Sequence, residues 1–365
     1  MKVVFRCDAS LQMGNGHVMR CLTLADTLSK QGADCSFLCR AHEGNLIEFI
    51  QGRGYAVTAL PYQDRAACPV VDEPVLAHQD WLGTTWVIDA EDSLKAIGAK
   101  AVDWIIVDHY SLDQRWEKRV GSACDSMMVI DDLADRQHDC ALLLDQNFQR
   151  LSGDYDGLVG TDTIKLCGAQ YALLQPRFAE LRAYSLARRE KPKLQHLLIS
   201  MGGVDKDNAT GKVLEALGQF DLKAADIELT IVMGLNDPWF GQVQEQASCL
   251  PLKSRVQVNV ANMAELMADA DLAIGAAGST SWERCCLGVP SIQVVLADNQ
   301  TRIAQALSDS NAALMADVDN LVEVLSVVFG DDGVQRGILK KLSHCAAAVT
   351  DGRGVFLVAD YLGTR

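Results

Sequence analysis

Residues 3–28 read VVFRCDASLQMGNGHVMRCLTLADTL. The apolar run Val3–Arg6 predicts a buried strand. Between Val18 and Leu28, apolar residues recur at spacings of three and four, which predicts a helix. A turn that contains Gly14 and Gly16 joins the two. A strand, a glycine turn and a helix in this order are typical of a parallel α/β sheet.

The same alternation continues through all 365 residues, which is too long for one ordinary core. It predicts an α/β fold of two doubly wound Rossmann-like domains. We expect an N-terminal domain over 1–187, a linker over the basic run 188–194 and a C-terminal domain over 195–365, with the last helix free to pack back on the first domain. The region 61–80 contains several prolines and is expected to be a loop or an insertion.

The predicted strands are 3–6, 35–39, 55–60, 104–108, 127–131, 196–200, 227–233, 255–260, 272–275 and 291–295. The predicted helices are 18–28, 45–51, 212–217, 239–246, 263–268 and 301–307, with a final one that ends near 361.

Charge and composition exclude several classes of protein. The net charge of −15 argues against a general nucleic-acid binder, because phosphate backbones are held mainly by Lys and Arg. The apolar runs are shorter than the ~20 residues of a membrane-spanning helix, and Asp8 interrupts the start where a signal peptide would stay apolar. The 12 cysteines are scattered through predicted strands and helices, which is typical of a reducing compartment. We expect a cytoplasmic monomer without membrane or nucleic-acid partners.

The turn Gly14-Asn15-Gly16-His17 is the strongest local feature. Its glycines allow a ligand to approach the backbone, and the helix start offers free N–H groups to a phosphate. The third glycine of a dinucleotide fingerprint would fall at Met19, so a nicotinamide enzyme is disfavoured. His17 can act as a general base near pH 7; alternatively, it only caps the helix.

Polar side chains follow two further strands of the first half. Asp108 and Tyr110 come at the end of the strand 104–108, where Asp108 can polarise a histidine or cap the next turn, and Tyr110 can bind a sugar or orient the base. Asp131 and Asp132 end another strand, but neighbouring strand residues point to opposite faces, which disfavours a metal pair.

The second half contains two glycine turns. Gly202 and Gly203 follow the strand 196–200 and can hold a phosphate on backbone amides, or form a tight turn alone. The second turn, residues 275–283, ends in Gly278, Ser279, Thr280 and Glu283. Its Ser and Thr suit a pyrophosphate at a helix start and its Glu suits a ribose, although Thr280 and Glu283 also have the spacing of a capping box. Asn299 and Gln300 follow the next strand and offer amides to the same ligand.

These residues resemble the UDP-sugar hydrolases of pseudaminic acid biosynthesis over nearly the whole chain. The motifs that carry the resemblance are Phe5-Arg6-x-Asp8-Ala9-Ser10, Gly14-x-Gly16-His17-x-x-Arg20, Asp108-His109-Tyr110, Met201-Gly202-Gly203-x-Asp205 and Gly275 through Gly288. The opening motif is the most specific, whereas the glycine motifs of the second half are shared with the wider GT-B group, which includes the glycosyltransferase that makes lipid II. The resemblance implies a GT-B-like pair of domains that face each other across a cleft.

The resemblance also implies a reaction. UDP-2,4-diacetamido-2,4,6-trideoxy-β-L-altropyranose would be hydrolysed at its anomeric C–O bond with inversion, without metal or other cofactor. His17 would activate the water and Tyr110 would lie near the reacting sugar. UDP and the free sugar would be released. The residues expected to bind substrate are Asp8, Gly14, Asn15, Gly16 and Asp108 in the first half, and Gly202, Gly203, Gly278, Ser279, Thr280, Glu283, Asn299 and Gln300 in the second.

Two other readings use the same residues. A GT-B glycosyltransferase would move a sugar from a UDP donor to an acceptor alcohol, and its second half would look alike. A non-catalytic nucleotide-sugar binding protein would not need His17, Tyr110 and Glu283 together.

Overall fold

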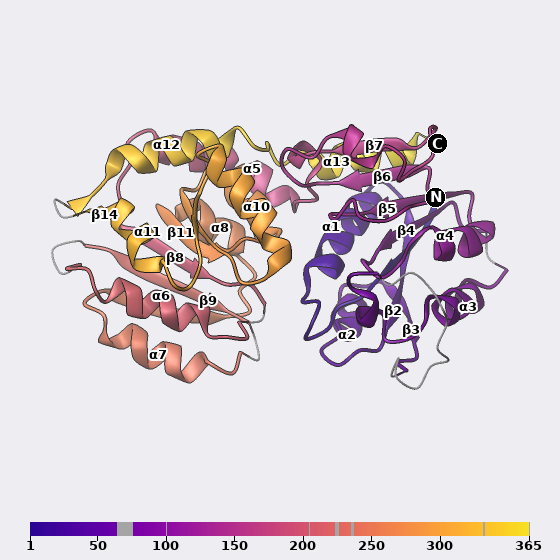
Figure 1. Ribbon diagram of the computed structural model, residues 1–365, viewed down its shortest axis with the longest axis horizontal. Coiled ribbons are helices and arrows are strands. Elements are labelled where there is room, and N and C mark those ends of the chain that lie inside the picture. Colours follow the sequence, from indigo (N-terminus) through magenta and orange to yellow (C-terminus); the bar gives the residue numbers. More distant parts are fainter. Residues whose placement is uncertain are drawn as a thin grey trace. The chain divides into compact units, whose positions relative to one another are not determined.

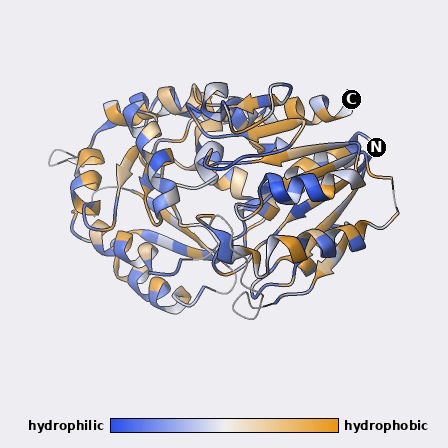
Figure 2. Ribbon diagram, turned by 45° about the vertical axis from the view of Figure 1, so that its right-hand side comes forward, coloured by the Kyte–Doolittle hydropathy of each residue, from blue (hydrophilic) through white to orange (hydrophobic). Residues whose placement is uncertain are grey.

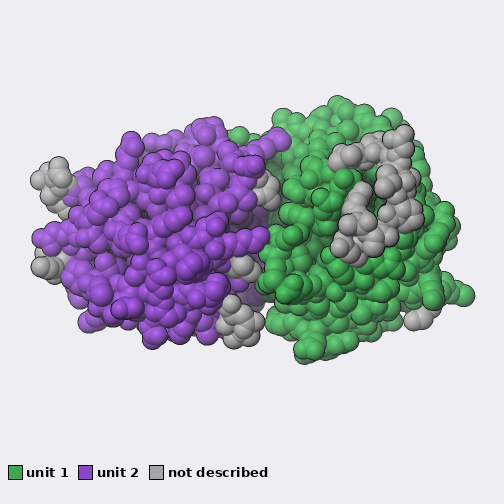
Figure 3. Space-filling model, turned by 60° about the horizontal axis from the view of Figure 1, so that its bottom comes forward, with its two compact units in different colours: residues 1–173, 354–365 green, residues 174–353 purple. Residues whose placement is uncertain are grey.

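The computed structural model of the chain describes residues 1–63, 76–99, 101–203, 205–222, 226–234, 237–330 and 333–364. The side chains at 299, 333 and 334 also lie outside this description, as does the larger part of the region 61–80. The chain divides into two compact units, residues 1–173 with 354–365 (unit 1) and residues 174–353 (unit 2), which Figure 3 shows in green and purple.

Unit 1 contains a seven-stranded sheet in which every pair of neighbouring strands is parallel. Its strands are β1 (Lys2–Cys7), β2 (Asp34–Arg40), β3 (Ala56–Leu60), β4 (Trp104–Asp108), β5 (Ser126–Ile130), β6 (Leu142–Asp145) and β7 (Ile164–Cys167). They are ordered β3-β2-β1-β4-β5-β6-β7, so the direction of winding reverses between β1 and β4. In a doubly wound sheet, ligands bind at the carboxyl ends of the strands beside this switch point.

Helices cover both faces of this sheet (Figure 1). They are α1 (Gly16–Lys30), α2 (Ile47–Gly52), α3 (Trp86–Ile97), α4 (Gln114–Val120) and α13 (Gly354–Gly363). Neighbouring residues of β1 point to opposite faces of the sheet. Phe5 lies in the core between the sheet and the helices α1 and α13, and Val4 lies in the core between the sheet and the helices α3 and α4. Figure 2 shows the strands as mostly hydrophobic and the helices as two-sided.

Unit 2 repeats the design with six parallel strands ordered β10-β9-β8-β11-β12-β13. These are β8 (His196–Ser200), β9 (Glu228–Met233), β10 (Lys253–Val258), β11 (Leu272–Ala276), β12 (Ser291–Val294) and β13 (Leu314–Ala316). The helices are α5 (Pro176–Arg189), α6 (Ala209–Leu217), α7 (Phe240–Cys249), α8 (Met263–Asp269), α9 (Thr280–Cys286), α10 (Asp298–Asp309), α11 (Leu321–Val328) and α12 (Arg336–Ala347), and a small hairpin joins β14 (Phe329–Gly330) to β15 (Gly333–Val334). The predicted pair of Rossmann-like domains is confirmed.

The division between the units differs from the sequence-based boundary at 188–194. Helix α5 covers the first part of this range and belongs to unit 2. Its Arg182 donates to the carbonyl of Ala347, Ser185 to that of Leu287 and Arg189 to that of Ala270. These bonds to main-chain oxygens tie α5 to unit 2, although its polar sequence resembles a linker.

The last helix, α13, returns to unit 1; it is yellow in Figure 1 among magenta elements. Its residues Val355, Val358, Ala359 and Leu362 are fully buried in the same core as α1. Gly354 lies so close to the backbone at 171–172 that an added Cβ would be 2.4 Å from a main-chain carbon of Tyr171. The helix therefore completes the core of unit 1.

Within the described ranges, no helix combines the length and apolar character that a membrane crossing needs.

Candidate functional site

The turn after β1 brings His17 to the start of α1. Gly14 has a φ of +73°, a conformation that favours glycine, and its N–H donates to the carbonyl of Ser10 at 2.9 Å. Asn15 is the N-cap of α1 without a side-chain cap bond, and Gly16 is the first helical residue. This tight turn places His17 one residue into the helix.

His17 is paired with the last residue of β4. Its Nδ1 lies 2.6 Å from Oδ1 of Asp108, whose strand is hydrogen-bonded to β1 at the switch point. Only 8% of the His17 side chain is exposed, so the ring is mostly buried. Its Nε2 has no hydrogen-bond partner among the described residues. This atom is not fully buried, so it is accessible to solvent. One ring nitrogen is thus held by a carboxylate and the other is available.

Arg20, one turn after His17, holds the opposite side of the same carboxylate. Its Nε donates to Oδ2 of Asp108 at 2.6 Å and a terminal nitrogen donates to Oδ1 at 2.7 Å. Burial opposes the charge of Asp108, but Arg20 and then His17 outweigh it and hold the pKa of Asp108 well below its usual range. Asp108 is therefore an ionised, fully buried group that orients His17 and has no surface for a substrate.

A second carboxylate connects Arg20 to Tyr110. Asp132 accepts from Arg20 at 2.7 Å and from the hydroxyl of Tyr110 at 2.6 Å, both on Oδ2. The rings of Tyr110 and His17 pack edge to face, with 4.6 Å between their centroids and 84° between their planes. Burial and the charge of Asp132 raise the pKa of Tyr110 well above its ordinary value, so the phenol stays protonated. Arg20 and Asp132 complete the group around His17.

Two sequence-predicted residues of unit 1, Asp8 and Asp131, have other roles. Asp8 is fully buried, bonded to Arg6 at 2.7 Å and to the main-chain N–H of Arg40 at 2.6 Å, so its oxygens face the protein and not a ligand. Asp131 accepts from Arg136 and Tyr155, away from the partners of Asp132. In the described part of the chain, no group of three or more His, Cys, Asp or Glu side chains is arranged to hold a metal ion.

The first glycine turn of unit 2 is braced by a carboxylate. Gly202 has a φ of +98°, and nothing lies within 4 Å of the Cβ that another residue would add there. Asp205 accepts from the main-chain N–H groups of Ala209 and Thr210, each at 2.8 Å, next to the N-cap Asn208, which accepts from Gly211, so the start of α6 is fully capped. Gly202 and Gly203 are exposed beside this cap.

The second glycine turn joins β11 to α9. A Cβ on Gly275 would lie 2.4 Å from the carbonyl oxygen of Ser200, whereas Gly278 has nothing within 4 Å. Ser279, and not Thr280, is the N-cap position, and its side chain forms no cap bond, so the capping box that the spacing of Thr280 and Glu283 allowed is not formed. The hydroxyls of Ser279 and Thr280 therefore have no hydrogen-bond partner in the described residues. Gly278, Ser279 and Thr280 are at least partly exposed, which leaves the turn open to a ligand.

Glu283 lies one turn into α9. Burial raises its pKa to about 7, and the neighbouring Arg284 offsets only part of this effect. Arg284 is itself buried and donates to the carbonyl of Ala276 and to Oε1 of Gln293, each at 2.7 Å. It thereby fixes the glycine turn to β12, a role that no motif indicated.

The third segment of unit 2 differs from the predicted one. Helix α10 begins at Asp298 rather than 301, so residues 299 and 300 are helical instead of lying in a loop. The side-chain oxygen of Gln300 accepts from the main-chain N–H of Leu296 at 3.0 Å, which turns it toward the protein. The side chain of Asn299 lies outside the described part.

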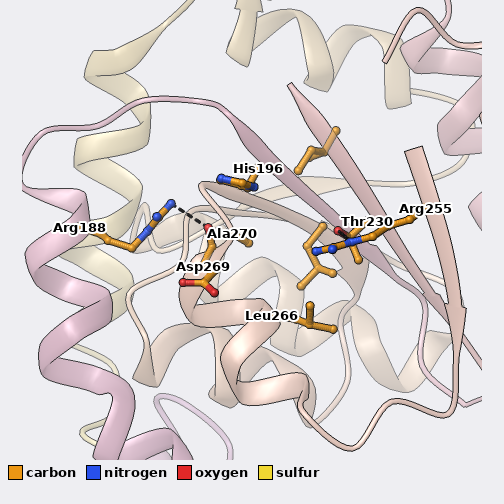
Figure 4. A pocket seen from close by; sticks show the side chains of 9 residues that line it. Arg188, His196, Thr230, Arg255, Leu266, Asp269 and Ala270 are labelled. Atoms are coloured by element: carbon orange, nitrogen blue, oxygen red, sulfur yellow. Dashed lines mark hydrogen bonds between the residues drawn. The ribbon is translucent and has the colours of Figure 1, made fainter. Parts of the chain in front are cut away.

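A cavity of about 240 Å³ lies elsewhere on unit 2, beside the first halves of β8, β9 and β10 (Figure 4). Its lining includes Arg188, His196, Arg255 and Asp269, and none of the predicted site residues. Arg188 is already bonded to the carbonyl of Asp269 at 2.8 Å and to Asp271. Its charge is therefore balanced within the protein.

Comparison with known proteins finds relatives over most of the chain. Residues 197–329 match the glycosyltransferase family 28 C-terminal domain. An uncharacterised protein of Methanocaldococcus jannaschii is 26% identical over 317 residues, 82% of this chain and 56% of that protein, so the chain spans little more than half of that relative. The UDP-2,4-diacetamido-2,4,6-trideoxy-beta-L-altropyranose hydrolase of Campylobacter jejuni is 27% identical over 308 residues, 84% of this chain and 96% of that protein. The resemblance indicated by the motifs is thus confirmed as a similarity over most of the chain.

Solved structures agree on the fold. The crystal structure of MurG from Acinetobacter baumannii matches 100% of this chain and 99% of its own with a TM-score of 0.65 and 18% identity. At this identity the match shows the fold alone.

Proposed function

We propose that this chain hydrolyses the anomeric C–O bond of a UDP-2,4-diacetamido-2,4,6-trideoxyhexose, with His17 as general base. The observation that carries the proposal is the contact of 2.6 Å between Nδ1 of His17 and Asp108. An ionised carboxylate at Nδ1 favours the tautomer with its proton on Nδ1 and the lone pair on Nε2, the nitrogen that is open to solvent. This is the arrangement that a histidine needs to take a proton from water.

The proposed reaction is an attack of water on the anomeric carbon, with proton transfer to His17 and departure of UDP. Water gives a proton to Nε2 of His17 as its oxygen bonds to the anomeric carbon, and the C–O bond to the diphosphate breaks on the opposite face, with inversion. The electron pair leaves with UDP, which is a good leaving group. Asp108 stabilises the imidazolium, and Arg20 keeps this carboxylate ionised. The proton then passes to solvent, and the free sugar is released.

The nucleotide is assigned to unit 2. The open turn at Gly278, Ser279 and Thr280 offers main-chain N–H groups and two hydroxyls to the diphosphate. Glu283 can accept from the ribose hydroxyls, and Gly202 and Gly203 allow close approach of a phosphate. The similarity of residues 197–329 to a glycosyltransferase C-terminal domain supports this assignment.

A GT-B glycosyltransferase is the second candidate, because the fold is shared with such enzymes. It differs in its need for an acceptor alcohol. The two candidates are separated by incubating the protein with a panel of UDP-sugars in ¹⁸O-water without acceptor.

For the hydrolase we expect release of UDP, with the label in the free sugar and none in UDP. Label in UDP would mean attack at phosphorus, and no turnover without an acceptor would favour the transferase. Binding of the UDP-sugar without turnover, whether an acceptor alcohol is present or absent, would indicate a non-catalytic binding protein. The rate should not change with a metal chelator, since the proposal involves no metal. The cytoplasmic location and the monomeric state stay predictions.

A further inference from the structure

A short loop of unit 1 places two more aromatic rings beside the His17 site. It contains His78 and the 3-10 helix η2 (Gln79–Leu82), at the end of the region to which the motifs assign no role. Leu82 is 1% exposed and anchors the loop in the core. The hydroxyl of Ser111 donates to the carbonyl of His78. The loop is therefore fixed next to Tyr110, which precedes Ser111.

The rings form one continuous series. The centroids of His78 and Trp81 are 4.4 Å apart, and they lie 5.5 and 5.9 Å from that of Tyr110. The planes of Trp81 and Tyr110 are within 26° of parallel. Since Tyr110 also contacts His17, the series begins at the proposed base and ends at Trp81.

This aromatic series is open to a ligand and carries little charge. Trp81 and His78 are partly exposed. The indole Nε1 of Trp81 has no hydrogen-bond partner in the described residues and is not a buried atom. Burial lowers the pKa of His78, which favours the neutral ring at neutral pH. The surface thus offers ring faces and one free N–H donor.

We infer that Trp81, supported by His78, recognises the apolar groups of the sugar during the reaction. The inference rests on the proposed function and adds a specificity-determining residue to it. A 2,4-diacetamido-2,4,6-trideoxyhexose has a methyl group where N-acetylglucosamine has the C6 hydroxymethyl, and a second acetyl group. Ring faces pack well against methyl groups, and an indole N–H can donate to an acetamido oxygen.

The test compares Trp81→Ala and Trp81→Phe with the wild type on two substrates, the UDP-diacetamidotrideoxyhexose and UDP-N-acetylglucosamine. Trp86→Ala is the matched control, since Trp86 is a partly buried tryptophan of the same unit whose ring packs against the guanidinium of Arg115. A methyl group in an apolar pocket is worth roughly 10- to 200-fold in discrimination. We expect Trp81→Ala to raise KM for the diacetamido substrate by at least ~10-fold, with a smaller change in kcat and a reduced preference over UDP-N-acetylglucosamine.

Trp81→Phe should keep most of the preference, because it keeps a ring face. Saturation-transfer NMR of the free diacetamido sugar, which needs no turnover, should show signal with the wild type and with Trp86→Ala and a loss of signal with Trp81→Ala.

The outcomes separate this inference from the proposed function. A wild type that hydrolyses no UDP-sugar contradicts the function, whereas an active wild type with unchanged KM and sugar binding in Trp81→Ala contradicts the inference alone. Equal losses on both substrates, without rescue by Trp81→Phe, would show that Trp81 only supports the fold, and would also overturn the inference.

Discussion

The carboxylate of Asp108 is shared between His17, at 2.6 Å from Nδ1, and Arg20, which donates two hydrogen bonds to it. Both carboxylate oxygens of Asp108 are hydrogen-bonded within the protein, and the side chain is fully buried. Asp108 can therefore fix the ring of His17 and its tautomer, but it cannot itself contact a sugar.

Replacing His17 by Asn should lower turnover by at least ~10², because general-base catalysis typically contributes 10²–10⁴-fold. Binding of UDP, measured by calorimetry, should be unchanged because the nucleotide is assigned to unit 2. His344→Asn, an exposed position on α12, is the control and should behave as the wild type. A normal rate in His17→Asn would remove this residue from the mechanism.

Replacing Asp108 by Asn should lower kcat by at least ~10-fold, since the amide no longer fixes the tautomer or stabilises the imidazolium. The double variant with His17→Asn should be no slower than His17→Asn alone, because Asp108 acts only through His17. Steady-state kinetics of the three variants checks this. Independent losses that multiply would show a separate role for Asp108.

The two glycines of the β11–α9 turn should respond differently to alanine. Gly275→Ala should destabilise the protein, because its Cβ would meet the backbone of Ser200 at 2.4 Å. Gly278→Ala has open space around its Cβ and should leave the thermal midpoint unchanged. If the diphosphate lies against Gly278, this methyl group should weaken UDP binding. Thermal unfolding and UDP titration of both variants distinguish the effects; unaltered UDP affinity in Gly278→Ala would place the diphosphate elsewhere.

Glu283 should make stability depend on pH. Its folded-state pKa of about 7 lies above the ordinary value, so its contribution is fully present below pH ~4 and is lost as the pH rises to about 7. Glu283→Gln cannot ionise and so avoids this loss. The thermal midpoint of the variant minus that of the wild type should therefore be more positive at pH 8 than at pH 5. Glu245→Gln, an exposed position on α7, is the control and should show no such change. A parallel pH dependence in wild type and Glu283→Gln would contradict the assignment.

Much of the fold could be predicted from periodicity. The strand 196–200 coincides with β8, and the glycine turn with its helix coincides with the start of α1. Periodicity did not reveal the short strands β6, β7, β13, β14 and β15, each of two to four residues. It also did not reveal the helices α3, α4, α5, α11 and α12. Helix α5 illustrates the reason. Its arginines and Ser185 are explained by bonds to distant main-chain carbonyls, which no local pattern reveals.

The site was predicted less completely than the fold. His17, Asp108 and Tyr110 are brought together as expected of strand ends at a switch point. Arg20 was part of a motif but received no role, although it lies one turn from His17 on the same helix face. The contacts of Asp132 could not be predicted, because its partners come from α1 and from the segment after β4, which only tertiary structure brings together.

The place of α13 has a consequence for biosynthesis. The first 173 residues lack this helix, and the ribosome makes all of unit 2 before adding it. During translation, the apolar side of α1 that receives Val355 and Leu362 therefore remains uncovered. Loss of α13 should therefore destabilise unit 1, which contains His17, rather than unit 2, although residues of unit 2 directly precede α13 in the chain.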